Sequence, residues 1–254
     1  MLPVYFLTLL LSVGAHVQKH KNRLHTNRII NGTIISSYQC PYYAMLYYGG
    51  VHSGGVIIRD NVILTAASVV DGFTDTDIEI FVGIESVGET YVTFPYDNRK
   101  TIKHPQYRYG NANYDVALMF LDVPLGMGGD VQQIALSSTR ASVGSVIGMC
   151  GFGYPNCNRT SNPSDRCQGM ASYELRWGAF QVRSYSGNTM YASGYGVSSC
   201  FGDFGGPVVR NNELQGIASL IQYQNCTGLN LIVSIPSVRP WIENTIREQL
   251  NTKS

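Results

Sequence analysis

Short runs of β-branched and aromatic residues recur along the chain from Tyr42 onward, separated by Gly, Asn or Asp. Runs of this length with turn residues between them predict the strands of an all-β sandwich or barrel. The first set is Tyr42–Tyr48, Gly55–Ile58, Val62–Ala66, Ile78–Val82, Tyr91–Phe94 and Val116–Leu121. The second set is Ser145–Met149, Ala179–Arg183, Met190–Ala192, Pro207–Val209, Leu214–Ile221 and Leu231–Ile235. Two sets of similar size predict two barrels.

The pattern changes near the C-terminus, where apolar residues recur every three or four positions as on one face of a helix. These positions are Val238, Trp241, Ile242, Thr245, Ile246 and Leu250. Ser237 precedes them and is a residue type that caps helix N-termini. The sequence therefore predicts an amphipathic C-terminal helix that begins after Ser237.

The N-terminus begins with an apolar run, Pro3–Ala15, which is too short to span a bilayer and ends in small residues. We interpret residues 1–15 as a secretory signal peptide. The alternative is a buried N-terminal strand. No later stretch is long and apolar enough for a membrane anchor, so we expect a secreted, extracellular protein without a membrane partner.

Composition restricts the partners of the chain. Its 254 residues are 44% hydrophobic and 14% charged, which suits one large core or two modest ones. The formal net charge is +1, and Lys and Arg cluster only within residues 19–28. Such a charge produces no field that would attract nucleic acid or an anionic membrane surface. We expect neither as a partner.

The six cysteines are an even number without a C-x-x-C pair or a His cluster. This usage favours disulfides in an oxidising compartment over a metal site, and we expect neither a metal nor a cofactor. Three sequons start at Asn31, Asn158 and Asn225 and are candidates for N-glycosylation in a secreted chain.

Four motifs in order along the chain carry a resemblance to a known family. They are Ile63–Val70, which is similar to L-T-A-A-H-C; Asn113–Leu118, similar to N-x-D-I-A-L; Gly151–Gly153, similar to G-W-G; and Gly202–Pro207, similar to G-D-S-G-G-P. The chain thus resembles the trypsin-like serine proteases. The resemblance implies two packed antiparallel six-stranded β-barrels with a C-terminal α-helix. It implies a domain over residues 29–254, with barrels over about 29–135 and 136–254.

The catalytic positions of that family are altered. Phe204 stands at the position of the nucleophilic serine and Ser68 at that of the histidine, while Asp115 matches the carboxylate. A phenyl ring has no lone pair for attack, and an alcohol does not accept a proton at neutral pH and return it to a leaving group. We expect a degenerate triad and no protease activity. Outside residues 1–28 the histidines are His52, expected at the surface, and His104, expected to be structural.

The substrate pocket is altered as well. By resemblance, Ser198 occupies the position of the carboxylate at the pocket bottom of trypsin, and Ile221 and Asn230 occupy two wall positions that are glycine in the family. Side chains there would fill a pocket that the family keeps open. The alternative is that the longer loop between Ser219 and Cys226 shifts the alignment and leaves the pocket open.

The resemblance also implies proteolytic processing. Residues 16–28 resemble a propeptide that is cut after Arg28, which would leave Ile29 as the mature N-terminus. In the family the freed ammonium pairs with the Asp before the nucleophile, and Asp203 has that position here. The alternative is that Arg28 is only a basic residue before a strand and Asp203 only a turn residue.

Disulfide pairing is assigned in part. The resemblance implies a bond between Cys200 and Cys226 beside the pocket. Cys157 and Cys167 lie in one loop around the Asn158 sequon and are expected to close it, with Cys40 then left for Cys150. Six cysteines allow about 15 pairings, so these last two pairs stay open.

Taken together, the residues favour a catalytically inactive protease homologue that functions by binding proteins. The double loss resembles the inactivated serine protease paralogues of the scabies mite, which implies host extracellular proteins, complement components among them, as partners. Two alternatives stay open. One is a residual serine hydrolase that uses Ser68 or Ser199 with another base, and the other is a decoy that binds protease inhibitors through the old cleft.

Overall fold

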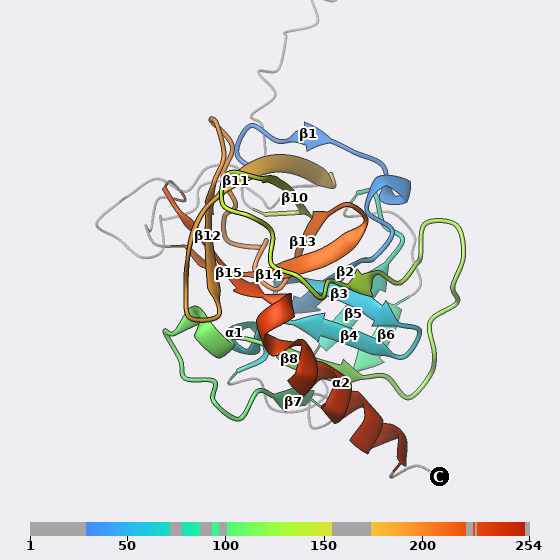
Figure 1. The fold of residues 1–254 in the computed structure, drawn as a ribbon. Coiled ribbons are helices and arrows are strands. Elements are labelled where there is room, and N and C mark those ends of the chain that lie inside the picture. The colour runs from blue at the N-terminus through green and yellow to red at the C-terminus, as the bar shows by residue number, and fades with distance from the viewer. Residues whose placement is uncertain are drawn as a thin grey trace, which may run out of the picture.

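The computed structural model describes residues 29–71, 78–86, 93–96, 101–153, 174–221, 226 and 228–251. Almost all of its regular structure is β-sheet, in two sheets (Figure 1). One is built from strands between residues 43 and 120, and the other mainly from strands after residue 135. The fold class predicted from the sequence is therefore confirmed. Within the described ranges, no helix combines the length and the apolar character that a membrane crossing requires.

The first sheet has seven strands in the order β6-β5-β2-β3-β4-β8-β7, and every pair in it is antiparallel. Its strands are β2 (Tyr43–Tyr48), β3 (Val51–Arg59), β4 (Val62–Thr65), β5 (Ile78–Val82), β6 (Thr93–Tyr96), β7 (Thr101–Lys103) and β8 (Ala117–Phe120). One short helix, α1 (Ala67–Val70), follows β4, and a 3₁₀ turn, η3 (Ala112–Tyr114), precedes β8. Ser68 lies in α1, and Asp115 directly follows η3.

The second sheet closes on itself, because β11 pairs with both β10 and β12. Its ring is β11-β10-β13-β14-β15-β12, with β1 and β9 attached to β11 and β14. The strands are β1 (Thr33–Ile34), β9 (Ala135–Leu136), β10 (Val146–Gly151), β11 (Arg176–Ser186), β12 (Thr189–Ser193), β13 (Pro207–Arg210), β14 (Glu213–Ile221) and β15 (Asn230–Ser234). Each of the six strands of the ring is therefore hydrogen-bonded to a neighbour on both sides.

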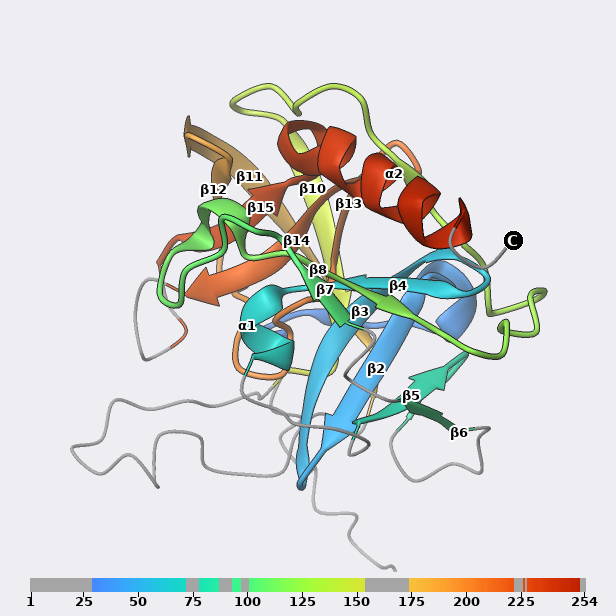
Figure 2. The same ribbon diagram turned by 90° about the horizontal axis from the view of Figure 1, so that it is seen from below.

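A single large cluster of buried residues joins the two sheets. It includes Ile63 and Leu118 from the first sheet, Ile217 from the second, and Ile242 and Ile246 from the C-terminal helix. The helix, α2 (Ile235–Asn251), lies across the end of the molecule beside β14 and the first sheet (Figure 2). Burial of these aliphatic side chains is the main force that fixes the sheets against each other, at about 1.5 to 3 kcal/mol for each.

The helix start differs from the prediction. Ser237 lies inside α2, two residues after its first residue, and is not the N-cap. Its hydroxyl instead accepts hydrogen bonds from the Arg140 guanidinium, at 3.1 Å from Nε and 2.7 Å from Nη2. Pro236 stands in the first turn, where a missing N–H removes no helical hydrogen bond. That proline was the sequence signal for the true start.

Two predicted disulfides are confirmed, Cys40–Cys150 and Cys200–Cys226. The first links the segment before β2 to β10 and so ties the start of the first sheet to the second. Cys157 and Cys167 lie outside the described residues, as do the sequons at Asn158 and Asn225, so their pairing and glycosylation stay predictions.

Candidate functional site: a degenerate serine protease centre

The loop between β12 and β13 holds the position of the nucleophile. Gly202 and Gly205 have φ values of 95° and 78°, which other L-residues rarely adopt. At Gly205 a Cβ atom would also lie 2.2 Å from the Gly54 carbonyl oxygen. The Gly54 N–H donates to the Phe204 carbonyl at 2.7 Å. The loop is thus held by backbone contacts, and its shape does not depend on the side chain at position 204.

Phe204 presents a ring where the family has a hydroxyl. The ring is partly buried against the large core cluster, and its centroid lies 5.7 Å from that of Phe201 at an angle of 73°. This edge-to-face geometry is the favoured one for two aromatic rings. The side chain is therefore held by packing, and it offers no atom for nucleophilic attack.

Asp115 is the best-preserved part of the centre. It ends η3 and is almost fully buried. Its Oδ1 accepts from the Ser68 N–H at 2.6 Å, and its Oδ2 accepts from the Ser68 hydroxyl at 2.7 Å and the Ser219 hydroxyl at 2.6 Å. Burial raises the pKa of Asp115, while these donors act in the opposite direction.

Ser68 thus fills the place of the base with a short hydroxyl. It lies in α1, and its Oγ is committed to Asp115 as a hydrogen-bond donor. Because the Ser68 hydroxyl already donates its proton to the Asp115 carboxylate, Ser68 satisfies this buried acceptor and does not relay a proton. The structure brings Ser68 and Asp115 together as predicted, and it adds Ser219, which the sequence analysis did not assign to the centre.

Replacing Ser219 tests how much this network stabilises the fold. Ser219→Ala removes one of three donors from a buried carboxylate, so we expect the free energy of unfolding to fall by about 1 to 3 kcal/mol. Chemical denaturation at pH 7 measures it. Ser145→Ala is the control, because the hydroxyl of this half-buried residue donates to the backbone carbonyl of Ser142 and to no carboxylate, so its loss is expected to cost less. Equal losses for the two variants would contradict a special role of Asp115.

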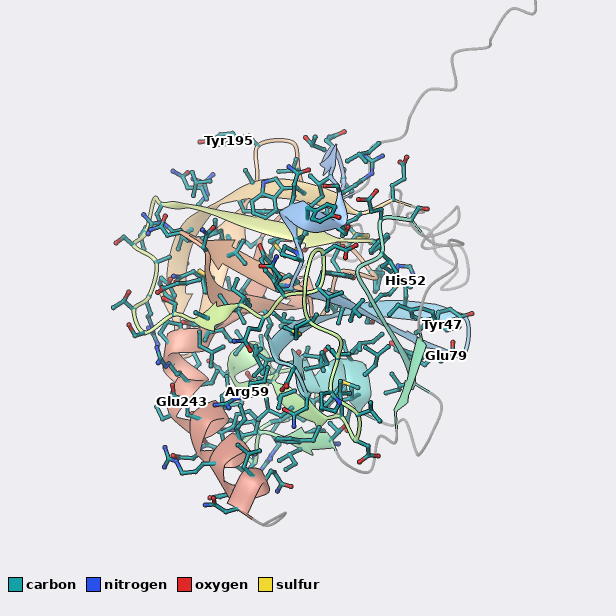
Figure 3. All side chains as sticks on the ribbon, turned by 90° about the vertical axis from the view of Figure 1, so that its right-hand side faces the viewer. Tyr47, His52, Arg59, Glu79, Tyr195 and Glu243 are labelled. Atoms are coloured by element: carbon teal, nitrogen blue, oxygen red, sulfur yellow. A yellow bond between two sulfur atoms is a disulfide. The ribbon has the colours of Figure 1, made fainter. Side chains whose placement is uncertain are left out.

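His52 does not lie at the surface, as the sequence analysis expected. It is buried in β3, and its Nε2 lies 2.8 Å from the Phe152 carbonyl oxygen. Burial lowers the pKa of its ring. In register, Tyr47 of β2 stands opposite both His52 and Glu79 of β5, the three labelled in Figure 3. Because the strand starts at Val51, four residues before the predicted start, His52 belongs to the sheet.

His52 also lies beside the nucleophile loop. A Cβ atom on Gly202 would come within 2.8 Å of the His52 Nε2. In the family the backbone N–H of this glycine helps to bind the oxyanion. Its neighbourhood here is occupied by an imidazole whose Nε2 is bonded to a carbonyl.

His104 is structural, as expected. Its ring stacks on Tyr114 at 4.6 Å and contacts Trp241 at 4.7 Å between centroids. Its Nδ1 accepts from the Gln106 N–H at 3.1 Å. The histidine therefore fastens the loop before η3 to the C-terminal helix.

Asn230, one of the predicted pocket residues, is buried, and both the oxygen and the nitrogen of its side-chain amide form hydrogen bonds. Its Oδ1 accepts from the Ser199 N–H at 3.2 Å and from the Ser199 hydroxyl, and its Nδ2 donates to the Ala192 carbonyl at 3.1 Å. Ser198 is also buried, and its hydroxyl donates to the Ser199 carbonyl. For Ile221 the structure gives the backbone, paired with Asn230, and the side chain lies outside what is described. The amide of Asn230 therefore joins β12 to the loop that precedes β13, and whether its side chain fills a substrate pocket stays a prediction.

Asp203 is fully buried and accepts two backbone hydrogen bonds, from Gly153 N–H at 2.8 Å and Cys200 N–H at 2.9 Å. Burial raises the pKa of its carboxyl to about 7. Ile29 is fully buried in the core of the second sheet, and Ile30 forms an antiparallel bridge with Ser198. The start of the domain thus lies against the pocket loop, and cleavage after Arg28 stays a prediction.

The one sequon within the described residues starts at Asn31. Asn31 is exposed, and its backbone φ is 59°. Its side-chain Nδ2 donates to the Gly196 carbonyl. A glycan at Asn31 would have to share this nitrogen with that hydrogen bond. Occupancy stays a prediction.

Fold and site together define a serine protease homologue. It retains the carboxylate, Asp115, and the nucleophile loop, while Ser68 and Phe204 replace the catalytic histidine and serine. Residues 29–242 match the model of the Trypsin family, and the chain belongs to that family. It is 35% identical to trypsin-1 of Salmo salar over 126 residues, which cover 47% of this chain and 51% of the relative. It is 28% identical to trypsin iota of Drosophila melanogaster over 197 residues, 74% and 75% of the two chains. The chain thus spans about half the length of the first of these relatives.

Solved structures share the fold. Two are crystal structures of scabies mite inactivated protease paralogues, with TM-scores of 0.74 and 0.72 and sequence identities of 19% and 23%. Each comparison covers 85% of this chain, and 96% and 99% of the paralogues. At these identities the likeness establishes the fold, and what the chain does has to be argued from its residues.

Proposed function

We propose that this protein is a secreted, catalytically inactive serine protease homologue that acts by binding other proteins. The observation that carries the proposal is the bonding of Asp115, whose second oxygen accepts from the Ser68 hydroxyl where a base would be required. With Phe204 at the nucleophile position, acyl transfer has neither an attacking atom nor a proton acceptor. The loss of a whole triad lowers turnover by about 10⁶-fold in a protease.

Three further features support this proposal. The two similar solved structures are titled as inactivated protease paralogues, so the fold is known to occur without the activity. The two disulfides favour an oxidising, extracellular location. The Asn230 bridge supports a filled pocket. The scabies mite resemblance favours host extracellular proteins, such as complement components, as partners.

The residual hydrolase alternative requires a reactive hydroxyl at Ser68 or Ser199. Ser68 donates to Asp115, and the buried Ser199 hydroxyl donates to Asn230. Both hydroxyl protons are therefore directed to acceptors that are not imidazoles. The inhibitor decoy alternative requires an open pocket, against which the Asn230 bridge argues.

The inactivity is tested with a fluorophosphonate probe and p-nitrophenyl acetate, using protein cleaved after Arg28. We expect no covalent labelling and ester hydrolysis no faster than in buffer. Labelling that Ser68→Ala or Ser199→Ala abolishes would establish the hydrolase instead.

Binding is tested separately by adding the protein to a serum complement assay. We expect inhibition at micromolar concentration, with an active trypsin-family protease blocked by the same probe as the control for the fold alone. Absence of inhibition would exclude complement as the partner and leave the catalytic conclusion standing.

A further inference from the structure

A groove lies on the outer face of the closed barrel, over β11, β10 and β13, which run side by side in Figure 1. Its volume is about 580 Å³, which is within the range of small-molecule sites. The residues that line it are Gln39, Tyr42, Ser145–Gly148, Trp177, Ala179 and Val209–Asn212. None of them belongs to the degenerate protease centre.

Two small residues that are paired on this face shape the floor of the groove. Gly148 of β10 pairs with Ala179 of β11, and paired residues point to the same side of a sheet. Their neighbours in sequence, Ile147 and Phe180, point to the other side and pack in the barrel interior. Trp177, two positions before Ala179, spreads its indole over Gly148, where a Cβ atom would lie 1.7 Å from the ring. The hollow is therefore bordered by an aromatic ring.

The opposite border is polar. Arg210 ends β13, and its guanidinium makes no ion pair or hydrogen bond with any described residue. Asn211 and Asn212 form the two-residue turn to β14, with φ values of 52° and 58° that suit a type I′ hairpin. Their amides and that of Gln39 are exposed at the rim. A half-buried arginine and three residues with side-chain amides thus line one border of the groove.

The groove and the degenerate protease centre lie at opposite ends of β13. Pro207 begins β13 beside the Phe204 loop, while Arg210 ends it, and four residues of strand span about 10 Å. A ligand bound at Arg210 therefore leaves the protease centre untouched, and its binding is independent of whether that centre is active.

We propose that this groove is a binding site for an acidic saccharide, such as a uronic acid residue of a glycan. An aromatic ring offers an apolar platform to the C–H face of a sugar, and amide groups bond its hydroxyls. The unpaired Arg210 guanidinium matches a carboxylate through a bidentate, charge-assisted hydrogen bond. Tyr42 lines the groove as well, and its phenol makes no hydrogen bond with any described residue.

The test compares two probes that differ only in the acid, methyl β-D-glucuronide and methyl β-D-glucoside, by saturation-transfer NMR and titration calorimetry on the intact protein. We expect the glucuronide to bind at about millimolar Kd, the usual range for one weakly held small ligand, and the glucoside at least about tenfold more weakly. Arg210→Gln should remove this preference.

Two further variants keep the test independent of folding. Ala179→Leu fills the hollow without removing a donor and should abolish binding of both probes. Arg183→Gln removes a cation from the same strand, β11, outside the groove, and should leave binding unchanged. The proposal fails if the glucuronide does not bind, if Arg183→Gln weakens it as much as Arg210→Gln, or if Arg210→Gln leaves the preference intact. Binding of trialanine in place of the glucuronide would assign the groove to a peptide carboxylate and also overturn it.

Discussion

The double variant Ser68→His/Phe204→Ser is expected to hydrolyse p-nitrophenyl acetate about 10²-fold to 10³-fold faster than the wild-type protein, since a complete triad contributes about 10⁶-fold. The expectation follows from what the centre retains. Asp115 is buried and already bonds the backbone of residue 68 and the Ser219 hydroxyl. A histidine at position 68 would replace the Ser68 hydroxyl as the donor to Oδ2.

Each single variant is expected to stay within about threefold of the wild type, because base and nucleophile act as a unit. The matched control is Ser68→His/Phe204→Ala, which has the base and the smaller side chain but no hydroxyl. Fluorophosphonate labelling should occur only in the Phe204→Ser double variant. If the control hydrolyses the ester equally fast, the histidine acts without the serine hydroxyl, and the two changes have not rebuilt a triad.

Full trypsin-like activity is not expected from these two changes. Asn230 joins Ser199 to Ala192 at a position that we predict to lie in the pocket, and Ser198 supplies no charge for a basic side chain. Adding Asn230→Gly should remove the bridge but leave the Ser199 hydroxyl without this acceptor. A gain in turnover of apolar peptide amides after the third change, with unchanged ester hydrolysis, would identify Asn230 as the block.

The sequence predicted the fold and the triad positions because each depends on a local pattern. Continuous apolar runs marked β4 and β8, and the motif around Asp115 marked the carboxylate. The start of β3 was missed for a physical reason. His52-Ser53-Gly54-Gly55 has the composition of a loop, yet Gly54 belongs to a strand. A Cβ there would lie 2.6 Å from the Gly206 Cα, so the glycine serves close packing against the nucleophile loop.

The sequence also did not predict which side chains form hydrogen bonds with each other. The sequence indicated that Asn230 would fill the pocket, but it gave no indication that its amide joins Ser199 to Ala192. Ser219 was likewise part of a motif and not recognised as a donor to Asp115, which is 104 residues distant in sequence. Such contacts depend on the register between strands, and a pattern within one strand does not contain that information.

Cleavage after Arg28 is expected to reverse the pH dependence that Asp203 gives to stability. In the uncleaved chain Ile29 has an amide nitrogen, and burial raises the pKa of Asp203 from 3.8 to about 7. The folded state then binds a proton that the unfolded state releases. The free energy of unfolding therefore falls as pH rises from about 4 to about 7, by at most about 1.4 kcal/mol per pH unit.

In the cleaved chain an ammonium at Ile29 would pair with Asp203 and hold the pKa of that carboxyl below its ordinary value. This contribution is present above the unfolded pKa, which is about 4, and is lost as pH falls through the lower folded pKa. The ammonium in turn acquires a raised pKa, so stability is lost again as pH rises through that value, above about 8. Denaturant unfolding from pH 3 to pH 9 on both forms measures the two profiles.

Asp203→Asn is the control, because it keeps the shape of the side chain and removes the titration. His52 also makes the free energy of unfolding depend on pH, with a sign opposite to that of Asp203 in the uncleaved chain. Burial lowers the pKa of His52, so its protonation at low pH destabilises the fold. This dependence is present in every form and cancels when each is compared with its Asn variant. If the Ile29 ammonium and the Asp203 carboxylate form an ion pair, Asp203→Asn should lower the free energy of unfolding at pH 7 by about 3 to 5 kcal/mol, and only in the cleaved chain. Identical profiles before and after cleavage would mean that the new N-terminus does not reach Asp203 and that the switch of the active proteases has been lost together with their triad.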